Sequence, residues 1–190
     1  MSKLDEPFAF YASYHHNKIN QIIHIICVWP ILFTALIFFT YAGTINDYIP
    51  AAIAEYIPKG IVVPINFLVA LRYIVYYAYI EQPGIAGIIA VGLVVFGLRF
   101  AQYAVETYAS AWIPALAVHV FCWIAQFYGH FAHEMRAPAL FDNLFQALVL
   151  APLFVIMEVL FMFGYKRDFQ KRVNIIVQKN LAEFKTGKSK

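Results

Sequence analysis

Residues 14–42, YHHNKINQIIHIICVWPILFTALIFFTYA, join a histidine-rich entry to a long apolar run. The run begins near residue 21 and has about the 20 residues that an α-helix needs to cross a lipid bilayer. Histidine is costly to carry into lipid, so histidines at the entry of such a helix require partners inside the protein. The stretch therefore predicts a membrane-spanning helix with a polar site at one end.

The composition of the whole chain also indicates a membrane protein. Of the 190 residues, 62% are hydrophobic and 13% are charged, whereas a soluble domain has about 25% charged residues. Further apolar runs occur at about 61–80, 84–105, 109–128 and 139–165. A spanning β-barrel would show alternating segments of about ten residues, but these runs are continuously apolar. We therefore predict an all-α fold: a polytopic integral membrane helical bundle with about 4–6 transmembrane or re-entrant helices.

Basic residues gather at the C-terminus. Eight of the fourteen Lys and Arg residues follow position 165. A basic cluster next to a membrane segment favours the cytoplasmic side, with lipid headgroups rather than nucleic acid as its partner. We therefore divide the chain into a membrane-embedded domain at 1–165, which contains the candidate site, and a basic cytoplasmic tail at 166–190.

The charge distribution also predicts a topology. If the first four apolar runs cross alternately, the entry of the first and the exit of the fourth share one face. That face would carry Lys3, Lys18 and Arg136, and the opposite face would carry Lys59. The run at 139–165 either crosses once or dips in and returns with a bend near Pro152. We favour the re-entrant path, because it gathers nearly all basic residues and both termini on one cytoplasmic face.

The first histidine block follows helical spacing. His16, Asn20 and His24 are spaced i, i+4 and i+8, so they would share one face of a helix. Asn17 is a favourable N-cap residue. A helix that starts after Asn17 would leave His15 and His16 in the preceding loop, where they could turn toward the site.

A second polar block lies at 119–140, HVFCWIAQFYGHFAHEMRAPAL. Its polar residues fall within a narrow helical sector, and such a stripe on an apolar helix must face protein rather than lipid. These residues are His119, Gln126, His130 and His133, with Glu134 one turn beyond His130 and with Arg136 and Pro138 closing the helix. We expect this block to meet the first one at the same face of the membrane.

The two blocks admit several interpretations. A single histidine in a membrane helix more often packs through hydrogen bonds than binds a ligand, and this reading fits His119 and His133 taken alone. Clustered imidazoles from two helices beside a carboxylate match the ligands of iron, zinc, copper or nickel, which favours a metal site. Two alternatives are a haem-binding electron-transfer protein and a transporter or scaffold whose histidines relay protons or pack.

The segments YHHNKINQIIH at 14–24 and QFYGHFAHEMRAPALFDNLFQALVLAP at 126–152 resemble the 2-hydroxy fatty acid dioxygenase family of the endoplasmic reticulum. This family degrades phytosphingosine to odd-numbered fatty acids. The resemblance extends over residues 7–170. It rests on the double histidine with Asn17, Asn20 and His24, and on Gly129 and His130 followed by Glu134, Arg136, Pro138, Ala139 and Leu140.

The resemblance implies an iron(II)-dependent enzyme that uses O2 to shorten a long-chain 2-hydroxy fatty acid by one carbon, a step of fatty acid α-oxidation. It makes 1–165 the catalytic domain, Fe(2+) the cofactor, and the endoplasmic reticulum membrane the location, or the inner membrane in a bacterium. The family's histidines fall on His15, His16, His24 and His130. Whether His15 or His16 binds the metal, and whether one or two metals bind, stays open.

Other polar residues then acquire expected roles. Asn20 and Glu134 are expected to be catalytic or to orient the histidines, with helix packing as the alternative for Asn20 and Gln126. Residues expected to contact substrate or to support the ligands are Asn17, Gln126, His119, His133 and Arg136. The carboxylate and hydroxyl oxygens of the substrate could fill two metal positions and O2 another. The alkyl chain would enter sideways from the lipid bilayer, and the oligomeric state stays open.

Overall fold

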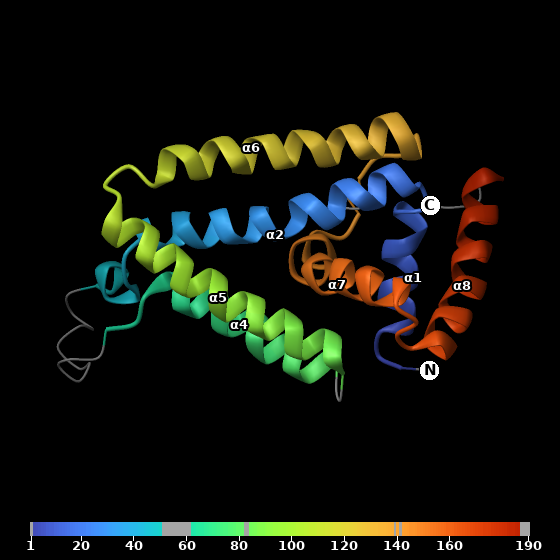
Figure 1. Cartoon of the computed structure of the whole chain (residues 1–190), viewed down its shortest axis with the longest axis horizontal. Helices are drawn as coiled ribbons and strands as arrows, with labels where there is room; N and C mark the ends of the chain where they lie inside the picture. Colours follow the sequence, from blue (N-terminus) through green and yellow to red (C-terminus); the bar gives the residue numbers. More distant parts are fainter. Residues whose placement is uncertain (1, 51–61, 82–83, 139, 141, 187–190) are drawn as a thin grey trace.

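The computed structural model describes residues 2–50, 62–81, 84–138, 140 and 142–186 (Figure 1). The α-helices are α1 (Asp5–Tyr14), α2 (Lys18–Tyr41), α4 (Ile65–Ile80), α5 (Ile85–Thr107), α6 (Trp112–Tyr128), α7 (Ala151–Met162) and α8 (Arg167–Lys185). Shorter helical segments are the 3-10 helix η1 (Ile45–Tyr48) and the π-helices η2 (Gly129–Glu134) and η4 (Gln146–Leu150). Over these residues the only β pairing is an isolated bridge between Thr44 and Pro64. The predicted all-α class is confirmed.

Among the described residues, three helical segments are long and apolar enough to cross a membrane: Lys18–Tyr41, Ile85–Thr107 and Trp112–Glu134. A fourth candidate is the pair Gln146–Met162 and Arg167–Phe184, which is bent by 116°. The shorter apolar helix α4 occupies most of the run expected at 61–80, while Lys59 lies outside the described residues. These segments confirm a helical membrane bundle.

Helix α2 is the centre of the bundle. It packs against α4, α5, α6 and α7 (Figure 1), and the side chains of Leu36, Val94 and Phe154 are fully buried between these helices. Large apolar residues such as Ile88 and Phe121 are exposed on the outer faces of α5 and α6. An apolar exterior of this extent is suited to contact with lipid tails.

The segment after η2 returns toward the interior. Figure 1 shows α6 ending near α8, whereas η4 and the start of α7 lie nearer the middle of the molecule. Two tyrosines of α4 donate to the carbonyls of η4, with Tyr73 bonded to Leu148 and Tyr77 to Val149. The predicted bend near Pro152 is wrong. The chain turns before Gln146, and Pro152 lies in the first turn of α7, where its missing N–H is not needed.

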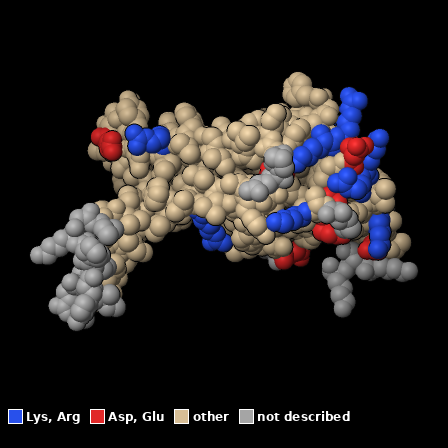
Figure 2. All heavy atoms as spheres, turned by 90° about the horizontal axis from the view of Figure 1, so that it is seen from below, with Lys and Arg blue, Asp and Glu red and all other residues tan. Residues whose placement is uncertain are grey.

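Several connections gather at one end of the bundle. The Glu81 carboxylate, which follows α4, accepts hydrogen bonds from Tyr165 at 2.9 Å and Lys166 at 2.6 Å between α7 and α8. Figure 1 shows α1 beside α8, and Figure 2 shows Lys and Arg concentrated at that end of the visible face. The entry of α2, the end of η2 and α8 therefore share one end of the molecule.

An ion pair fastens α8 to α1. The buried Asp5 carboxylate accepts from Arg172 Nε at 3.1 Å and Arg172 Nη2 at 3.2 Å, and from Ser2 Oγ at 2.6 Å. Burial by itself raises the pKa of Asp5, but the hydrogen bonds from Arg172 and Ser2 outweigh it and hold the pKa below its ordinary value. The ring of Phe8 packs on Phe169 beside this pair. Removing the guanidinium would therefore leave a buried carboxylate without its counter-charge.

We expect Arg172→Ala to loosen α8 from α1. Hydrogen exchange of the α8 amides should accelerate by about tenfold or more, because the uncompensated Asp5 favours opening of this contact. Mass spectrometry of exchange in detergent or nanodiscs measures the effect. Lys171→Ala is the matched control, since Lys171 is exposed and pairs with exposed Asp168. Equal exchange in both variants would contradict the role of the Asp5–Arg172 pair.

Candidate functional site

A helix break sets the positions of the first histidines. Helix α1 ends at Tyr14 and α2 begins at Lys18. The Asn17 side chain accepts from the Ile19 amide at 2.8 Å, which confirms Asn17 as the N-cap. The break leaves His15 and His16 in the connection. His15 turns into the protein and is buried, whereas His16 is exposed.

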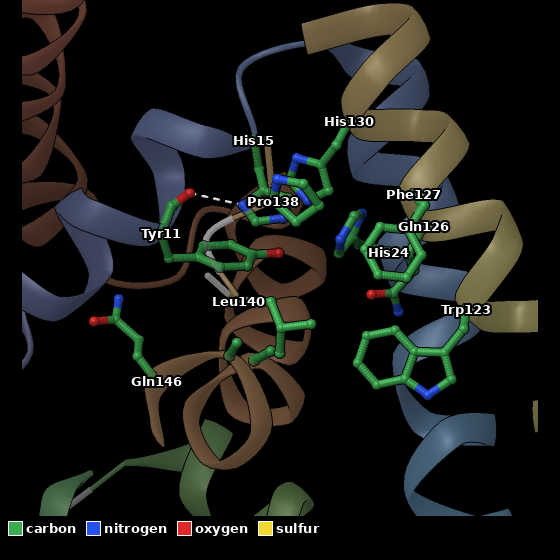
Figure 3. A pocket seen from close by; sticks show the side chains of 12 residues that line it. Tyr11, His15, His24, Trp123, Gln126, Phe127, His130, Pro138, Leu140 and Gln146 are labelled. Carbon is green, nitrogen blue, oxygen red and sulfur yellow. Dashed lines mark hydrogen bonds between the residues drawn. The ribbon is translucent and has the colours of Figure 1, made fainter. Parts of the chain in front are cut away.

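His15 is held in one orientation. Its Nδ1 lies 2.7 Å from the Tyr11 carbonyl oxygen, and its ring stacks on the Tyr11 ring at 4.0 Å between centroids (Figure 3). Burial, followed by the neighbouring rings of His24 and His130, lowers the pKa of His15 well below its ordinary value. The ring is therefore neutral at pH 7. Since a carbonyl only accepts, Nδ1 carries the proton, and the buried Nε2 is left as an unpaired acceptor.

His24, on α2, is oriented by a backbone carbonyl in the same way as His15. Its Nδ1 lies 2.9 Å from the Asn20 carbonyl oxygen in the preceding turn of α2. The same argument places the proton on Nδ1 and leaves a lone pair on Nε2. A backbone carbonyl behind each ring is the usual way in which proteins orient metal-binding histidines.

His130 completes a three-histidine cluster. Its ring centroid lies 4.9 Å from those of both His15 and His24, and the latter two are 4.2 Å apart. One ring nitrogen from each residue falls within 4.8 Å of the others. The buried Nδ1 of His130 has no hydrogen-bond partner among the residues that the structure describes. Three converging imidazoles, two of them with an unpaired buried nitrogen, suit a divalent transition metal.

A π-helix and a glycine bring His130 to this place. His130 lies in the first turn of η2, and π-turns of this kind are frequent at functional sites. Directly before it, Gly129 faces the Asn20 side chain of α2, and a Cβ at Gly129 would collide with Asn20 Oδ1. Glycine therefore allows α2 and η2 to approach closely enough for His24 and His130 to meet.

Glu134 links the two histidine blocks outside the cluster. Its Oε1 accepts from the Asn17 amide at 2.7 Å and from Asn20 Nδ2 at 3.1 Å. Asn20 Nδ2 also lies 3.3 Å from the Tyr14 carbonyl oxygen. The carboxylate thus joins the end of η2 to the start of α2, close to the positive end of the α2 dipole.

The remaining candidate site residues differ in their position relative to the histidine cluster. Gln126 borders the histidine cluster, and its buried Nε2 has no hydrogen-bond partner within the described part of the chain. His119 is farther along α6, where it bonds to Thr34 and Trp123. His133 contacts the ring of Tyr128, and Arg136 stacks between the rings of Tyr14 and Phe184. The structure therefore brings His15, His24, His130 and Gln126 together and leaves His16, His119 and His133 outside the cluster.

A narrow cavity of about 50 Å³ opens at the cluster (Figure 3). The residues that line it besides the histidines and Gln126 are Tyr11, Trp123, Phe127, Pro138, Leu140, Gln146, Ala147 and Ala151. Sequence reasoning had named Pro138 and Leu140 as parts of the second histidine block, without a place in a cavity, and it missed the others. Tyr11 is one helical turn before His15, and Trp123 and Phe127 precede His130 by seven and three residues, so helical spacing could have found them. Ala147 and Ala151 carry no comparable local signal.

The chain was compared with protein families, curated proteins and solved structures. Residues 1–163 match the family described as 2-hydroxy-palmitic acid dioxygenase Mpo1-like. Over 163 residues the chain is 30% identical to the 2-hydroxy-palmitic acid dioxygenase MPO1 of Saccharomyces cerevisiae. The aligned region covers 85% of this chain and 82% of the yeast protein. No solved structure matches. The resemblance expected from the two histidine blocks is confirmed, and the chain belongs to the 2-hydroxy-palmitic acid dioxygenase Mpo1-like family.

Proposed function

We propose that this protein is an iron(II)-dependent membrane dioxygenase that uses O2 to remove one carbon from long-chain 2-hydroxy fatty acids. The observation that supports it most is the convergence of His15, His24 and His130 on an apolar cavity, with unpaired buried nitrogens on His15 and His130. The family of the chain and the name of its yeast relative supply the substrate class.

In this proposal His15, His24 and His130 hold the iron. Bound iron supplies the redox chemistry by which O2 reacts with the 2-hydroxy acid. In the overall reaction the C1–C2 bond breaks, C1 leaves as carbon dioxide, and C2 becomes the carboxylate of the shortened acid. The electrons removed from both carbons reduce O2, so that its two oxygen atoms end in the new carboxylate and in water. The balance needs no further reductant.

The protein groups around the cluster orient the reactants and exclude water. The carbonyls of Tyr11 and Asn20 keep the His15 and His24 rings in place before any metal binds. Trp123, Phe127 and Leu140 cover the cavity with apolar surface. The unpaired Nε2 of Gln126 can donate to a carboxylate or hydroxyl oxygen of the substrate. Such a dry, oriented pocket favours one geometry of attack.

Asn20 and Glu134 act in this proposal as positioning residues. The Asn20 backbone holds His24, and its side chain bonds to Glu134 at the end of the π-helix that carries His130. A shift of the Glu134 side chain would therefore change the position of His24 relative to His130.

The proposed location in the cell follows from the distribution of basic residues. We place the protein in the endoplasmic reticulum membrane, or the inner membrane in a bacterium, with the end that carries α8 in the cytoplasm. The concentration of Lys and Arg at that end supports this orientation (Figure 2). The segment 166–190 would then lie along the lipid headgroups.

The haem alternative is less compatible with this geometry. A haem group would need a pocket of at least several hundred Å³, whereas the cavity at the three histidines has about 50 Å³. All three histidines therefore point to a single small site.

Metal analysis and oxygen uptake test the function directly. We expect protein purified in detergent and reconstituted with ferrous iron to bind about one iron per three-histidine cluster and to consume O2 only when 2-hydroxypalmitate is added. The shortened acid and carbon dioxide should form in equal amounts. Iron-loaded protein that consumes no O2 with 2-hydroxy acids of any chain length would contradict the proposal.

Single substitutions test the ligand set. His15→Ala, His24→Ala and His130→Ala should each lower bound iron and reduce turnover by about 100-fold or more, because each removes one imidazole. His16→Ala should keep both the bound iron and the turnover rate, since His16 is exposed and outside the cluster. Iron content by mass spectrometry and turnover measured on the same folded samples make the comparison. Loss of iron in His16→Ala with retention in His15→Ala would reverse the assignment.

Gly129→Ala tests the approach of the two helices. The added Cβ meets Asn20, so His130 should shift and iron affinity should fall by about 10-fold to 100-fold. Gly92→Ala on α5 is the matched control, because a Cβ there has nothing within 4 Å. Iron titration of both purified variants measures the difference. Equal affinities would show that this close approach does not position His130.

A further inference from the structure

Glu158 is a carboxylate in an otherwise uncharged segment. It is the only charged residue between Asp142 and Lys166, and it lies within the apolar helix α7. Within the described part of the chain, the ion pairs involve other acidic residues and not Glu158. An ionisable side chain in a membrane segment is costly and commonly has a specific task. The reaction proposed above gives Glu158 none.

The hydrogen-bond partner of Glu158 is Tyr11 on α1. Tyr11 is buried, and its Oη donates to Glu158 Oε2 at 3.0 Å. One turn earlier on α7, the ring of Phe154 lies 5.2 Å from the Tyr11 ring between centroids. Helix α7 therefore contacts both the ring and the hydroxyl of Tyr11. Because carbonyls inside an α-helix are already bonded within the helix, a side chain of α7 has to supply the acceptor that the buried hydroxyl needs.

Tyr11 in turn supports His15. The Tyr11 carbonyl oxygen lies 2.7 Å from His15 Nδ1, and the two rings stack at 4.0 Å between centroids with an angle of 22° between their planes. His15 lies in the connection between α1 and α2, whereas His24 and His130 are held within helical segments. Figure 3 shows the Tyr11 ring beside His15 at the cavity. The orientation of the His15 ring therefore depends on where Tyr11 lies.

The surroundings of Glu158 allow a polar group at this place. Glu158 lines a cavity of about 310 Å³ between α1, α2, α7 and α8. Lys18, Gln21, Gln170 and Asn174 line the same cavity, so it is polar and large enough to hold water. Water there lowers the cost of placing a carboxylate in α7. Glu158 thus connects a polar space beside α8 to the aromatic support of His15.

We propose that Glu158 is a positioning residue for His15 and acts through Tyr11. The proposal rests on the proposed function only in that His15 binds the metal. Glu158 fixes the Tyr11 hydroxyl, and the ring and carbonyl of Tyr11 then hold the His15 ring with Nε2 toward the other two histidines. Without the acceptor on α7, the Tyr11 hydroxyl is left unsatisfied inside the protein, so the ring shifts to reach another acceptor. His15 loses its support as a consequence.

Metal titration tests this role without turnover. Co²⁺ binds the same imidazole ligands as ferrous iron, and its visible absorption reports the geometry of its ligands. Glu158→Leu and Tyr11→Phe should each lower the Co²⁺ affinity of the purified protein by about tenfold, and Glu158→Gln, which keeps an acceptor, by less than about threefold. Tyr165→Phe is the matched control, because it removes another tyrosine–glutamate hydrogen bond, of 2.9 Å, outside the histidine cavity. It should leave the Co²⁺ affinity unchanged.

The Co²⁺ spectrum separates positioning from general stability. At saturating Co²⁺, Glu158→Leu should shift the visible bands of the bound ion and Glu158→Gln should restore them, whereas a loss of stability alone lowers the folded fraction and leaves the bands in place. Glu158→Leu combined with Tyr11→Phe should bind Co²⁺ about as weakly as either single variant, because both changes remove the same hydrogen bond.

Three results would overturn the proposal. The first is wild-type affinity and wild-type bands in Glu158→Leu. The second is a Glu158→Gln variant that binds Co²⁺ as weakly as Glu158→Leu. The third is a double variant in which the losses of the two single variants multiply, since Glu158 would then act apart from Tyr11.

The outcomes also distinguish this role from the proposed function. Suppose that wild-type protein binds Co²⁺ at the histidines and Glu158→Leu weakens this binding, but iron-loaded wild-type protein never oxidises 2-hydroxy acids. That result would refute the proposed function and leave the positioning role standing. Turnover of 2-hydroxypalmitate with unchanged Co²⁺ binding in Glu158→Leu would refute the positioning role alone. Wild-type protein that binds no Co²⁺ would overturn both.

Discussion

The hydrogen bonds from His15 and His24 to the backbone carbonyls of Tyr11 and Asn20 are the constraint on which the site depends. Each bond fixes which ring nitrogen carries the proton, and so leaves a lone pair directed into the protein. A buried imidazole nitrogen without a partner is unfavourable, and His15 and His130 both contain one. A bound metal would relieve this cost, which links the stability of the cluster to its occupancy.

The surrounding helices bring the three histidines together. The break between α1 and α2 turns His15 inward, the π-helix η2 presents His130, and Gly129 lets η2 approach α2. Glu134 then ties the end of η2 to the start of α2. The contacts lie near the end of the bundle where the basic residues gather, so a lipid carboxylate could reach the histidines from the headgroup region.

Much of the fold could be predicted from the sequence because long apolar runs leave few alternatives to membrane helices. The N-cap at Asn17 and the convergence of the two histidine blocks followed from spacing and alternating topology. Three features could not be predicted this way. The π-turn at η2 departs from α-helical periodicity, so His130 joins the histidine cluster while His133 contacts Tyr128, although the predicted stripe placed both in one helical sector. His119 bonds to Thr34 of another helix, and the return of the chain before Gln146 depends on tyrosines of α4.

The central claim is that His15, His24 and His130 together bind one metal ion. X-ray absorption at the iron edge, recorded on wild-type protein reconstituted with one equivalent of ferrous iron, tests it most directly. The account predicts outer-shell scattering from about three imidazole rings, as in other multi-histidine sites, and loss of one ring in His130→Ala. A spectrum without imidazole scattering, or one that is identical in His130→Ala, would contradict it.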